Sequence, residues 1–220
     1  MAGIKLINIS KSYKNKQILT SFSALINDGS FVLINGPSGS GKSTLLNIIG
    51  GIETPDSGEV IVDGKNIRGL RGRERVKLYQ KYVGFIFQGF YLDPKLTIAE
   101  NIALPGLFAK MKPADRKKRT AEISKILGIT DSLGKYPAET AGGHAERACI
   151  ARALFLSPRI ILADEPTSNL DKENAEKVLK ILQVFQEKTD TTIVVASHDE
   201  SVRSFATKVI TLGEANNENF

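Results

Sequence analysis

The sequence predicts an α/β fold in which helices cover a parallel sheet. Four apolar runs, "FVLING", "YVGFIF", "RIILADE" and "TTIVVAS", are nearly continuous in hydrophobicity, as expected for strands that are buried on both faces. Segments with helical patterns, "KSTLLNIIGG", "KENAEKVLKILQVFQEK" and "DESVRSFA", follow three of these runs. Strands that alternate with helices in this way form βαβ units, whose sheet is parallel.

A helical insert is predicted to interrupt this core. About 70 residues between Gln88 and Pro158 contain no convincing strand, while helical signals accumulate there. Thr97-Ile98-Ala99-Glu100 has the spacing of a capping box, Pro113 suits the first turn of a second helix, and Gly143 precedes a third.

The N-terminal part is predicted to add a small antiparallel sheet on one flank of the core. Its segments "IKLINIS", "QILTSFSALI" and "GEVIVDGKNI" alternate in polarity, and Asp63-Gly64 is a hairpin turn pair. We expect one domain, residues 1–220. Its α/β core with the antiparallel flank comprises residues 1–88 and 158–220, and its helical subdomain comprises residues 89–157.

Composition narrows the class of protein. With 220 residues and 41% hydrophobic content the chain can bury one full core. A single cysteine, Cys149, excludes a disulfide framework within the chain and a multi-cysteine zinc site, which suits a reducing compartment. The start "MAGIKLINIS" is no signal peptide, and no run approaches the roughly 18 apolar residues of a spanning helix. The net charge of +6 favours anionic partners without choosing among them.

A phosphate-binding loop is the most specific motif. The stretch "GPSGSGKST" matches G-x-x-x-x-G-K-[ST] and lies between an expected strand and an expected helix. Its glycines let backbone N–H groups curl around a phosphate, Lys42 can reach the β/γ oxygens, and Ser43 can ligate Mg²⁺. A chance match has odds on the order of one per cent. The expected nucleotide-binding residues of the loop are Gly36, Pro37, Ser38, Gly39, Ser40, Gly41, Lys42, Ser43 and Thr44.

Polar residues end three other predicted strands. Asp164 and Glu165 end "RIILADE", and neighbours on a strand point to opposite sides, so we expect Asp164 near Mg²⁺ and Glu165 to polarise an attacking water. Without the loop upstream, an ordinary acidic corner would be the better interpretation. Gln88 and His198 end two further strands, and the shared edge of the sheet brings them toward the same site.

These motifs together resemble the nucleotide-binding subunit of an ATP-binding-cassette (ABC) transporter, over essentially the whole chain. The fold implied is a P-loop NTPase core of the ABC type. The matching motifs, in chain order, are the aromatic Tyr13, the Walker A loop "GPSGSGKS", the Q-loop Gln88, the signature "TAGGHAER", the Walker B strand "IILADE", the D-loop "SNLD" with Asp171, and the switch His198.

The resemblance implies a role for each residue. Tyr13 would stack on adenine, although an exposed tyrosine in a turn is the alternative. Lys42 would contact the β/γ-phosphates of ATP, Glu165 would be the general base and His198 the sensor of the γ-phosphate. Mg²⁺ would be served by three residues, Ser43, Gln88 and Asp164.

The signature turn is expected to act on a second subunit. In this family two ATP molecules lie between head-to-tail partners, so Gly142 and Gly143 would offer N–H groups to a γ-phosphate in trans. The family turn reads L-S-G-G-Q or L-S-G-G-E, whereas Thr140, Ala141 and His144 stand here. Ala141 lacks a hydroxyl whose hydrogen bond would contribute about 1.5–3 kcal/mol. His144 would donate to phosphate if protonated, or stay exposed and uninvolved, the interpretation we favour.

The function implied is an ATPase that closes as a dimer and drives a polytopic membrane subunit, either by export or by mechanical signalling. "VGFIFQGFYLDPKLTIAENIALP" and "DEPTSNLD" look most like subunits of macrolide exporters, lipoprotein-releasing complexes, antimicrobial-peptide transporters and the FtsE type. Homodimer and heterodimer both remain open. The expected location is cytoplasmic, peripheral on the inner face of the cell membrane, and no nucleic-acid partner is expected.

Other interpretations stay open. One is a soluble or regulatory ABC-type ATPase with weak turnover. Another is a P-loop kinase, in which residues 140–147 and "SNLD" would have no role. The aromatic and apolar group Phe87, Phe90, Tyr91 and Leu92 is expected either in the core of the insert or in a groove for the membrane subunit's coupling helix. The basic stretch 110–125 could approach anionic headgroups, but a solvated helix face is the interpretation we favour.

Overall fold

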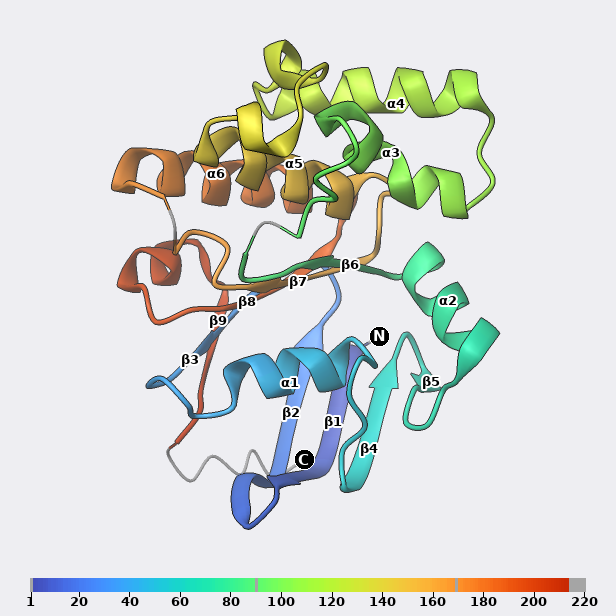
Figure 1. Cartoon of the computed structure of the whole chain (residues 1–220). Coiled ribbons are helices and arrows are strands. Elements are labelled where there is room, and N and C mark those ends of the chain that lie inside the picture. Colours follow the sequence, from blue (N-terminus) through green and yellow to red (C-terminus); the bar gives the residue numbers. More distant parts are fainter. Residues whose placement is uncertain (1, 90, 169, 214–220) are drawn as a thin grey trace.

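The computed structural model describes residues 2–89, 91–168 and 170–213, and it has the predicted fold class, with a parallel sheet, an antiparallel flank and a helical insert (Figure 1). In the described chain the parallel sheet has the strand order β6-β7-β8-β3-β9, and every neighbouring pair is parallel. Its strands are β3 (Phe31–Asn35), β6 (Val83–Ile86), β7 (Ile160–Asp164), β8 (Thr192–Ala196) and β9 (Lys208–Thr211).

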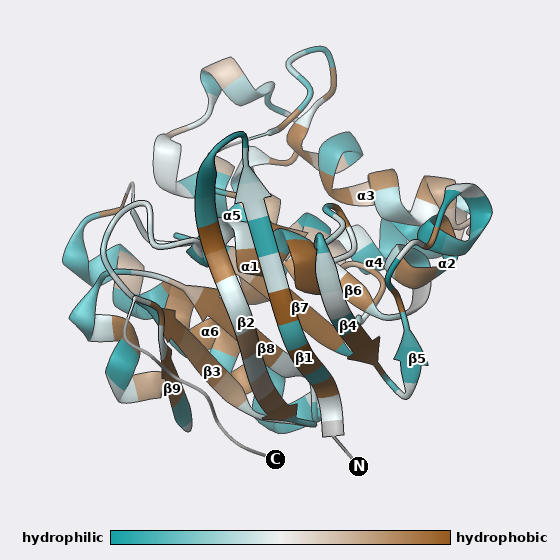
Figure 2. Cartoon of the chain, turned by 90° about the horizontal axis from the view of Figure 1, so that it is seen from below, coloured by the Kyte–Doolittle hydropathy of each residue, from teal (hydrophilic) through white to brown (hydrophobic). Residues whose placement is uncertain are grey.

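Helices cover both faces of this sheet because its strands are apolar on both sides. On β3, Val32 packs in the same cluster as helix α1 (Lys42–Ile49), whereas Leu33 packs in the cluster that contains residues of helix α6 (Lys172–Thr189). The same alternation holds on β7 and β8. The strands of the parallel sheet are accordingly predominantly hydrophobic in Figure 2, while the tip of the hairpin between β1 and β2 is hydrophilic.

The antiparallel sheet has the order β2-β1-β4-β5. Its predicted turn is confirmed, because Asp63 and Gly64 both have positive φ, 48° and 74°, as a type I′ hairpin turn requires. The strands are β1 (Ala2–Tyr13), β2 (Lys16–Asn27), β4 (Ser57–Val62) and β5 (Lys65–Asn66).

The described residues between 89 and 157 hold helices and no strand. They form α3 (Ile98–Phe108), α4 (Pro113–Ile126), two 3₁₀ helices (Thr130–Ser132 and Pro137–Glu139) and α5 (Gly142–Leu154). Thr97 caps α3 with the predicted capping box, and Pro113 opens α4. None of the helices in the described ranges has the length and apolarity to cross a bilayer.

Four details differ from the sequence-based expectation. Helix α5 begins at Gly142, so Gly143 lies inside its first turn instead of preceding it. The segment "DESVRSFA" forms a 3₁₀ helix (Glu200–Phe205), and the Asp199 carboxylate caps it by accepting from Ser201 N. Helix α2 (Gly72–Lys81) and strand β9 were not anticipated. The first is highly charged and the second is short, so neither has a clear hydrophobic period.

Candidate nucleotide site

The phosphate loop joins the carboxyl end of β3 to α1, as predicted. Gly36, Gly39 and Gly41 have φ of 151°, 77° and 98°, a region that other residues rarely occupy. At Gly41 the requirement is steric as well, because a Cβ there would lie 2.6 Å from Ile18 Cγ2. The loop therefore lies closely against β2, and Ser38, Gly39 and Gly41 line the cavity at the start of α1.

Lys42 supplies the positive charge of this loop. The side chain is buried, and its ammonium donates to the carbonyls of Gly36 at 2.8 Å and Pro37 at 3.2 Å. In the described chain it forms no ion pair, and the first turn of α1 contains no acidic residue. A buried cation and a helix N-terminus without a carboxylate partner attract an anion.

Ser43 and Asp164 come together at the end of β7. Ser43 Oγ donates to Asp164 Oδ1 at 3.0 Å. Burial raises the pKa of Asp164, and the negative charge of Glu165 adds to this, while the Ser43 hydrogen bond and Lys42 oppose it. A cation bound here would remove this cost by stabilising the ionised carboxylate.

The oxygen donors at this edge fit Mg²⁺. Ser43, Asp164 and the Gln88 amide supply hard oxygen ligands. No cluster of three or more His, Cys, Asp or Glu residues that could hold a metal by itself occurs within the described ranges. A site with so few protein ligands suits Mg²⁺, which keeps waters and binds phosphate oxygens of its substrate.

Glu165 is held from two sides by residues that follow β8. His198 Nδ1 lies 2.8 Å from Glu165 Oε1, and Ser197 Oγ donates to Oε2 at 3.1 Å. The Glu165 N–H donates to the Ala196 carbonyl, and its φ of +46° turns the chain out of β7. Ser197 was not singled out in the sequence, although its place beside His198 at a strand end was a usable signal.

A cavity of about 520 Å³ brings most of these groups together. Its lining residues include Ser38, Gly39, Gly41, Lys42, Ser43, Thr44, Gln88, Glu165 and His198. Lys16 and Ile18 also line it, and the sequence did not reveal them because only the β1–β2 hairpin, with Tyr13 paired to Lys16, carries them to the loop.

Tyr13 stands beside this cavity. Tyr13 is 44% exposed, and its hydroxyl lies 3.4 Å from Thr44 Oγ1 and donates to Glu53. Lys11 Nζ lies 5.4 Å from the ring centroid. Glu53 and Lys11 form an ion pair at 3.1 Å, so the tyrosine is fixed next to the loop with its ring accessible.

The signature turn lies at the exposed N-terminus of α5. Ala141 is the N-cap and provides no side-chain hydrogen bond. Gly142 and Gly143 have ordinary helical angles, so neither needs to be glycine for its backbone. A Cβ at Gly142 would have no described atom within 4 Å, and one at Gly143 would meet only Leu170 Cδ2 at 3.7 Å. Nothing in the described chain accounts for two glycines here.

The two unusual polar residues of this turn are both engaged within the chain. Thr140 Oγ1 donates to the Tyr136 carbonyl, so it does not replace the hydroxyl that Ala141 lacks. His144 is half-buried, with Nδ1 2.7 Å from Ser132 Oγ. Burial, aided by Arg147 and Lys135, lowers its pKa. The expectation of an exposed, uninvolved histidine is therefore corrected, since His144 ties α5 to the 3₁₀ helix Thr130–Ser132.

Asp171 caps α6. Its carboxylate accepts from Asn174 N at 2.9 Å and from Asn174 Nδ2, and these bonds lower its pKa. Of the predicted "SNLD" loop, Asn169 lies outside the described residues, as does Phe90 of the aromatic group.

Comparison with known proteins agrees with this geometry. The family model described as "ABC transporter" matches residues 19–168. The chain is 40% identical to the uncharacterized ABC transporter ATP-binding protein MJ0796 of Methanocaldococcus jannaschii, over 98% of this chain and 96% of that protein. It is 37% identical to the lipoprotein-releasing system ATP-binding protein LolD of Psychrobacter arcticus, over 100% and 99%. The solved dimer of the MJ0796 cassette bound to ADP and Pi superimposes with a TM-score of 0.90, at 40% identity, over 95% of this chain and 94% of that one.

Proposed function

The chain belongs to the ABC transporter family as an ATP-binding subunit with ATPase activity, and from this premise we propose that it binds ATP with Mg²⁺ at the Gly36–Thr44 loop and drives a separate membrane subunit by closing as a dimer. In this proposal Lys42 binds the β- and γ-phosphates, and Ser43, Gln88 and Asp164 hold the metal. Bound Mg²⁺ neutralises charge on the phosphate oxygens. The 3.0 Å bond between Ser43 and Asp164 supports this assignment.

Glu165 is the general base in this proposal. It accepts a proton from water as the water oxygen bonds to the γ-phosphorus, and the bond to the β–γ bridging oxygen breaks to leave ADP and phosphate. His198 bonds to Glu165 Oε1 and Ser197 bonds to Oε2, and each carboxylate oxygen keeps a lone pair that can accept from the water. His198, whose side chain is 70% exposed, faces the cavity from which the γ-phosphate would approach.

Tyr13 is proposed to stack on adenine. The exposed Tyr13 lies beside the first turn of α1, where its hydroxyl is 3.4 Å from Thr44 Oγ1. An accessible aromatic face can stack on the flat ring of a purine. Lys11 near the ring leaves the other face for the base.

The observation that supports the dimer most strongly is the pair Gly142 and Gly143. Their own chain does not require them, so we propose that they let a second subunit's γ-phosphate approach the amides of α5. A two-fold, head-to-tail arrangement of two chains would then complete each site with the partner's turn. Ala141 cannot donate a hydroxyl, so a partner's ATP would be held less tightly, and this also favours the second candidate, a slow regulatory ATPase.

A groove of about 590 Å³ is the proposed dock for the membrane subunit. It lies between α2, β6, α3 and the end of α5, and Val76 and Phe108 are 52% and 69% exposed at its edge. The rings of Phe85, Phe87 and Tyr91 continue this apolar surface toward Gln88, with centroids 4.2 and 5.6 Å apart. A short amphipathic helix fits such a groove, and it would hold the chain at the inner face of the membrane.

The substrate class is proposed from the relatives. LolD serves a lipoprotein-releasing system. Together with the motif resemblance to macrolide and peptide transporters, this supports a transporter of one of these types that exports its cargo or transmits force.

The experiment that tests the hydrolytic assignment compares Glu165→Gln with Glu176→Gln, a matched change on the exposed face of α6. We expect Glu165→Gln to bind ATP as the parent does and to lose at least 100-fold in ATP turnover. Glu176→Gln should retain full turnover. Equal turnover in the two variants would contradict the role of Glu165.

A further inference from the structure

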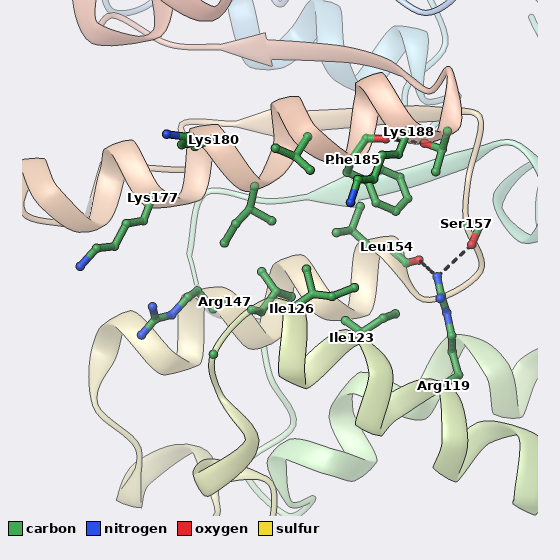
Figure 3. Close-up of a pocket in the computed structure, with 15 residues that line it drawn as sticks. Arg119, Ile123, Ile126, Arg147, Leu154, Ser157, Lys177, Lys180, Phe185 and Lys188 are labelled. Atoms are coloured by element: carbon green, nitrogen blue, oxygen red, sulfur yellow. Dashed lines mark hydrogen bonds between the residues drawn. The ribbon is translucent and has the colours of Figure 1, made fainter.

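A second elongated groove, of about 690 Å³, runs between α4 and α5 of the insert and α6 of the core (Figure 3). It shares no lining residue with the nucleotide cavity or with the groove proposed for the membrane subunit. Neither ATP binding nor the proposed docking therefore accounts for it.

The floor of this groove is apolar and comes from all three helices or their ends. Ile123 and Leu127 line it from the α4 side, Leu154 from α5, and Ile181 and Phe185 from α6. At its open side, Ile126 and Val184 are 64% and 39% exposed. These side chains, the hydrophobic strip of the groove, make its floor and open side apolar.

The rim of the groove is basic, and no lining residue is acidic. The Arg119 guanidinium donates hydrogen bonds to the carbonyls of Leu154 and Phe155 and to Ser157 Oγ. Lys177 forms an ion pair with Glu173. Five cations belong to the lining, namely Arg119, Arg147, Lys177, Lys180 and Lys188.

Two of these cations project at one end of the groove, Arg147 from α5 and Lys177 from α6 on the opposite wall (Figure 3). Lys180 lines the groove from the next turn of α6. Arg147 uses its Nε to donate to the Gly143 carbonyl, and its terminal nitrogens form no hydrogen bond to the described residues. Lys180 likewise forms no ion pair with the part of the chain that is described. This end attracts a single negative charge.

The shape of the groove selects the body of the ligand. The lining part of α6, from Lys177 to Thr189, is about 18 Å long at 1.5 Å per residue. An extended peptide would bury N–H and C=O groups against helix walls that offer them no partners. A single alkyl chain has no polar groups to bury, so it suits the apolar floor of the groove.

We propose that this groove binds one long-chain fatty acid. The alkyl chain lies on the floor toward Phe185, and the carboxylate lies between Arg147, Lys177 and Lys180. Because the groove is walled by the insert on one side and the core on the other, the bound chain contacts both parts at once.

Titration calorimetry with myristate, below its micellar concentration, tests this proposal on the full chain. We expect one myristate per chain, with affinity at least 10-fold higher than for hexanoate, which lacks the chain length, and for tetradecanol, which lacks the charge. Lys177→Glu/Lys180→Glu should weaken myristate binding at least 10-fold. The matched reversal Lys117→Glu/Lys118→Glu, on exposed residues of α4 outside the groove, should leave binding unchanged.

A second variant tests the floor. Val184→Glu places a carboxylate on the hydrophobic strip and should weaken myristate binding at least 10-fold at an unchanged melting temperature. Equal binding of tetradecanol, or equal loss in both lysine double variants, would overturn the proposal. So would binding only of anionic phospholipid vesicles or only of an acidic peptide, since either result assigns the groove to a different partner.

Discussion

His198 Nδ1 lies 2.8 Å from Glu165 Oε1, so residues that end two neighbouring strands, β7 and β8, are joined by a hydrogen bond at the mouth of the nucleotide cavity. Ser197 occupies the second oxygen of the same carboxylate at 3.1 Å. Glu165 is buried and its backbone is left-handed, which fixes the carboxylate in one orientation. The geometry assigns His198 a positioning role toward Glu165 in addition to the proposed contact with phosphate.

His198→Ala is expected to lower ATP turnover about 100-fold while the dissociation constant for ATP changes less than 3-fold, because orientation of the base is lost and the phosphate loop is intact. Steady-state ATPase assays and nucleotide titration measure the two quantities. His198→Gln, which keeps a donor, should recover part of the rate. A variant with full turnover would rule out this role.

Ala141→Ser is expected to raise ATP turnover in the assembled complex about 10-fold, since the restored hydroxyl adds a hydrogen bond to charged phosphate in the closed dimer. The control is Ala121→Ser, the same change on an exposed residue of α4. An unchanged or lower rate for Ala141→Ser would show that the turn does not act as described.

Gly142→Ala should separate folding from function. The position is helical and has free space around it, so alanine should keep or raise the melting temperature, by up to about 1 kcal/mol of stability. The added methyl group would block a partner's phosphate, and ATP-dependent dimerisation and turnover should fall at least 10-fold. Light scattering with ATP measures the dimer. A lower melting temperature with intact ATP-dependent dimerisation would contradict the claim that Gly142 serves the partner's phosphate.

Glu146 gives a pH dependence of stability. It is buried, its Oε2 has no hydrogen-bond partner among the described residues, and burial raises its pKa from 4.5 to about 7. The folded chain therefore holds a proton that the unfolded chain releases between these two pH values. As far as Glu146 is concerned, the free energy of unfolding is therefore highest below pH 4.5. It declines as pH rises toward 7, by up to about 3 kcal/mol.

Glu146→Gln should remove this decline. Urea unfolding at pH 5 to 8 should show that the variant exceeds the parent in stability at pH 8 and that the difference shrinks toward pH 5. Glu122→Gln, on the exposed face of α4, is the control and should follow the parent at every pH. Parallel profiles for Glu146→Gln and the parent would contradict the assignment.

Phe108→Glu tests the groove proposed for the membrane subunit. The side chain is 69% exposed, so the fold should tolerate the charge and basal ATP turnover should not change. Copurification with the membrane subunit should be lost. Leu107→Glu offers a comparison, because Leu107 is 51% exposed on the same helix but does not line the groove; equal retention of the membrane subunit by both variants would argue against docking there.

Much of the fold was predictable because its signals are local. The apolar strands, the capping box at Thr97 and the Asp63-Gly64 turn each follow from a few adjacent residues, and all three appear in the structure. Helix α2 was missed because its charges hide the hydrophobic period. The segment after β8 was expected to be helical, and local polarity does not distinguish the 3₁₀ helix found there from an α-helix.

The site was predictable where chemistry is tied to a motif, as at Lys42 and Asp164. It was not predictable where contacts depend on distant segments. Ile18, which makes Gly41 obligatory, reaches the loop only through the register of β1 and β2. The bond between His144 and Ser132 likewise depends on how the insert folds back on itself.

The most direct test of the account is an ATP-dependent disulfide across the proposed dimer. Ser38→Cys and Ala141→Cys are combined with Glu165→Gln, and the native Cys149 should not interfere because burial raises its pKa to about 11. With ATP and Mg²⁺, and with the membrane partners present, we expect an intermolecular cross-link between the loop of one chain and the α5 turn of another, absent with ADP and in each single-cysteine variant. Saturating ATP with no such cross-link would contradict the claim that the turn completes a second subunit's site.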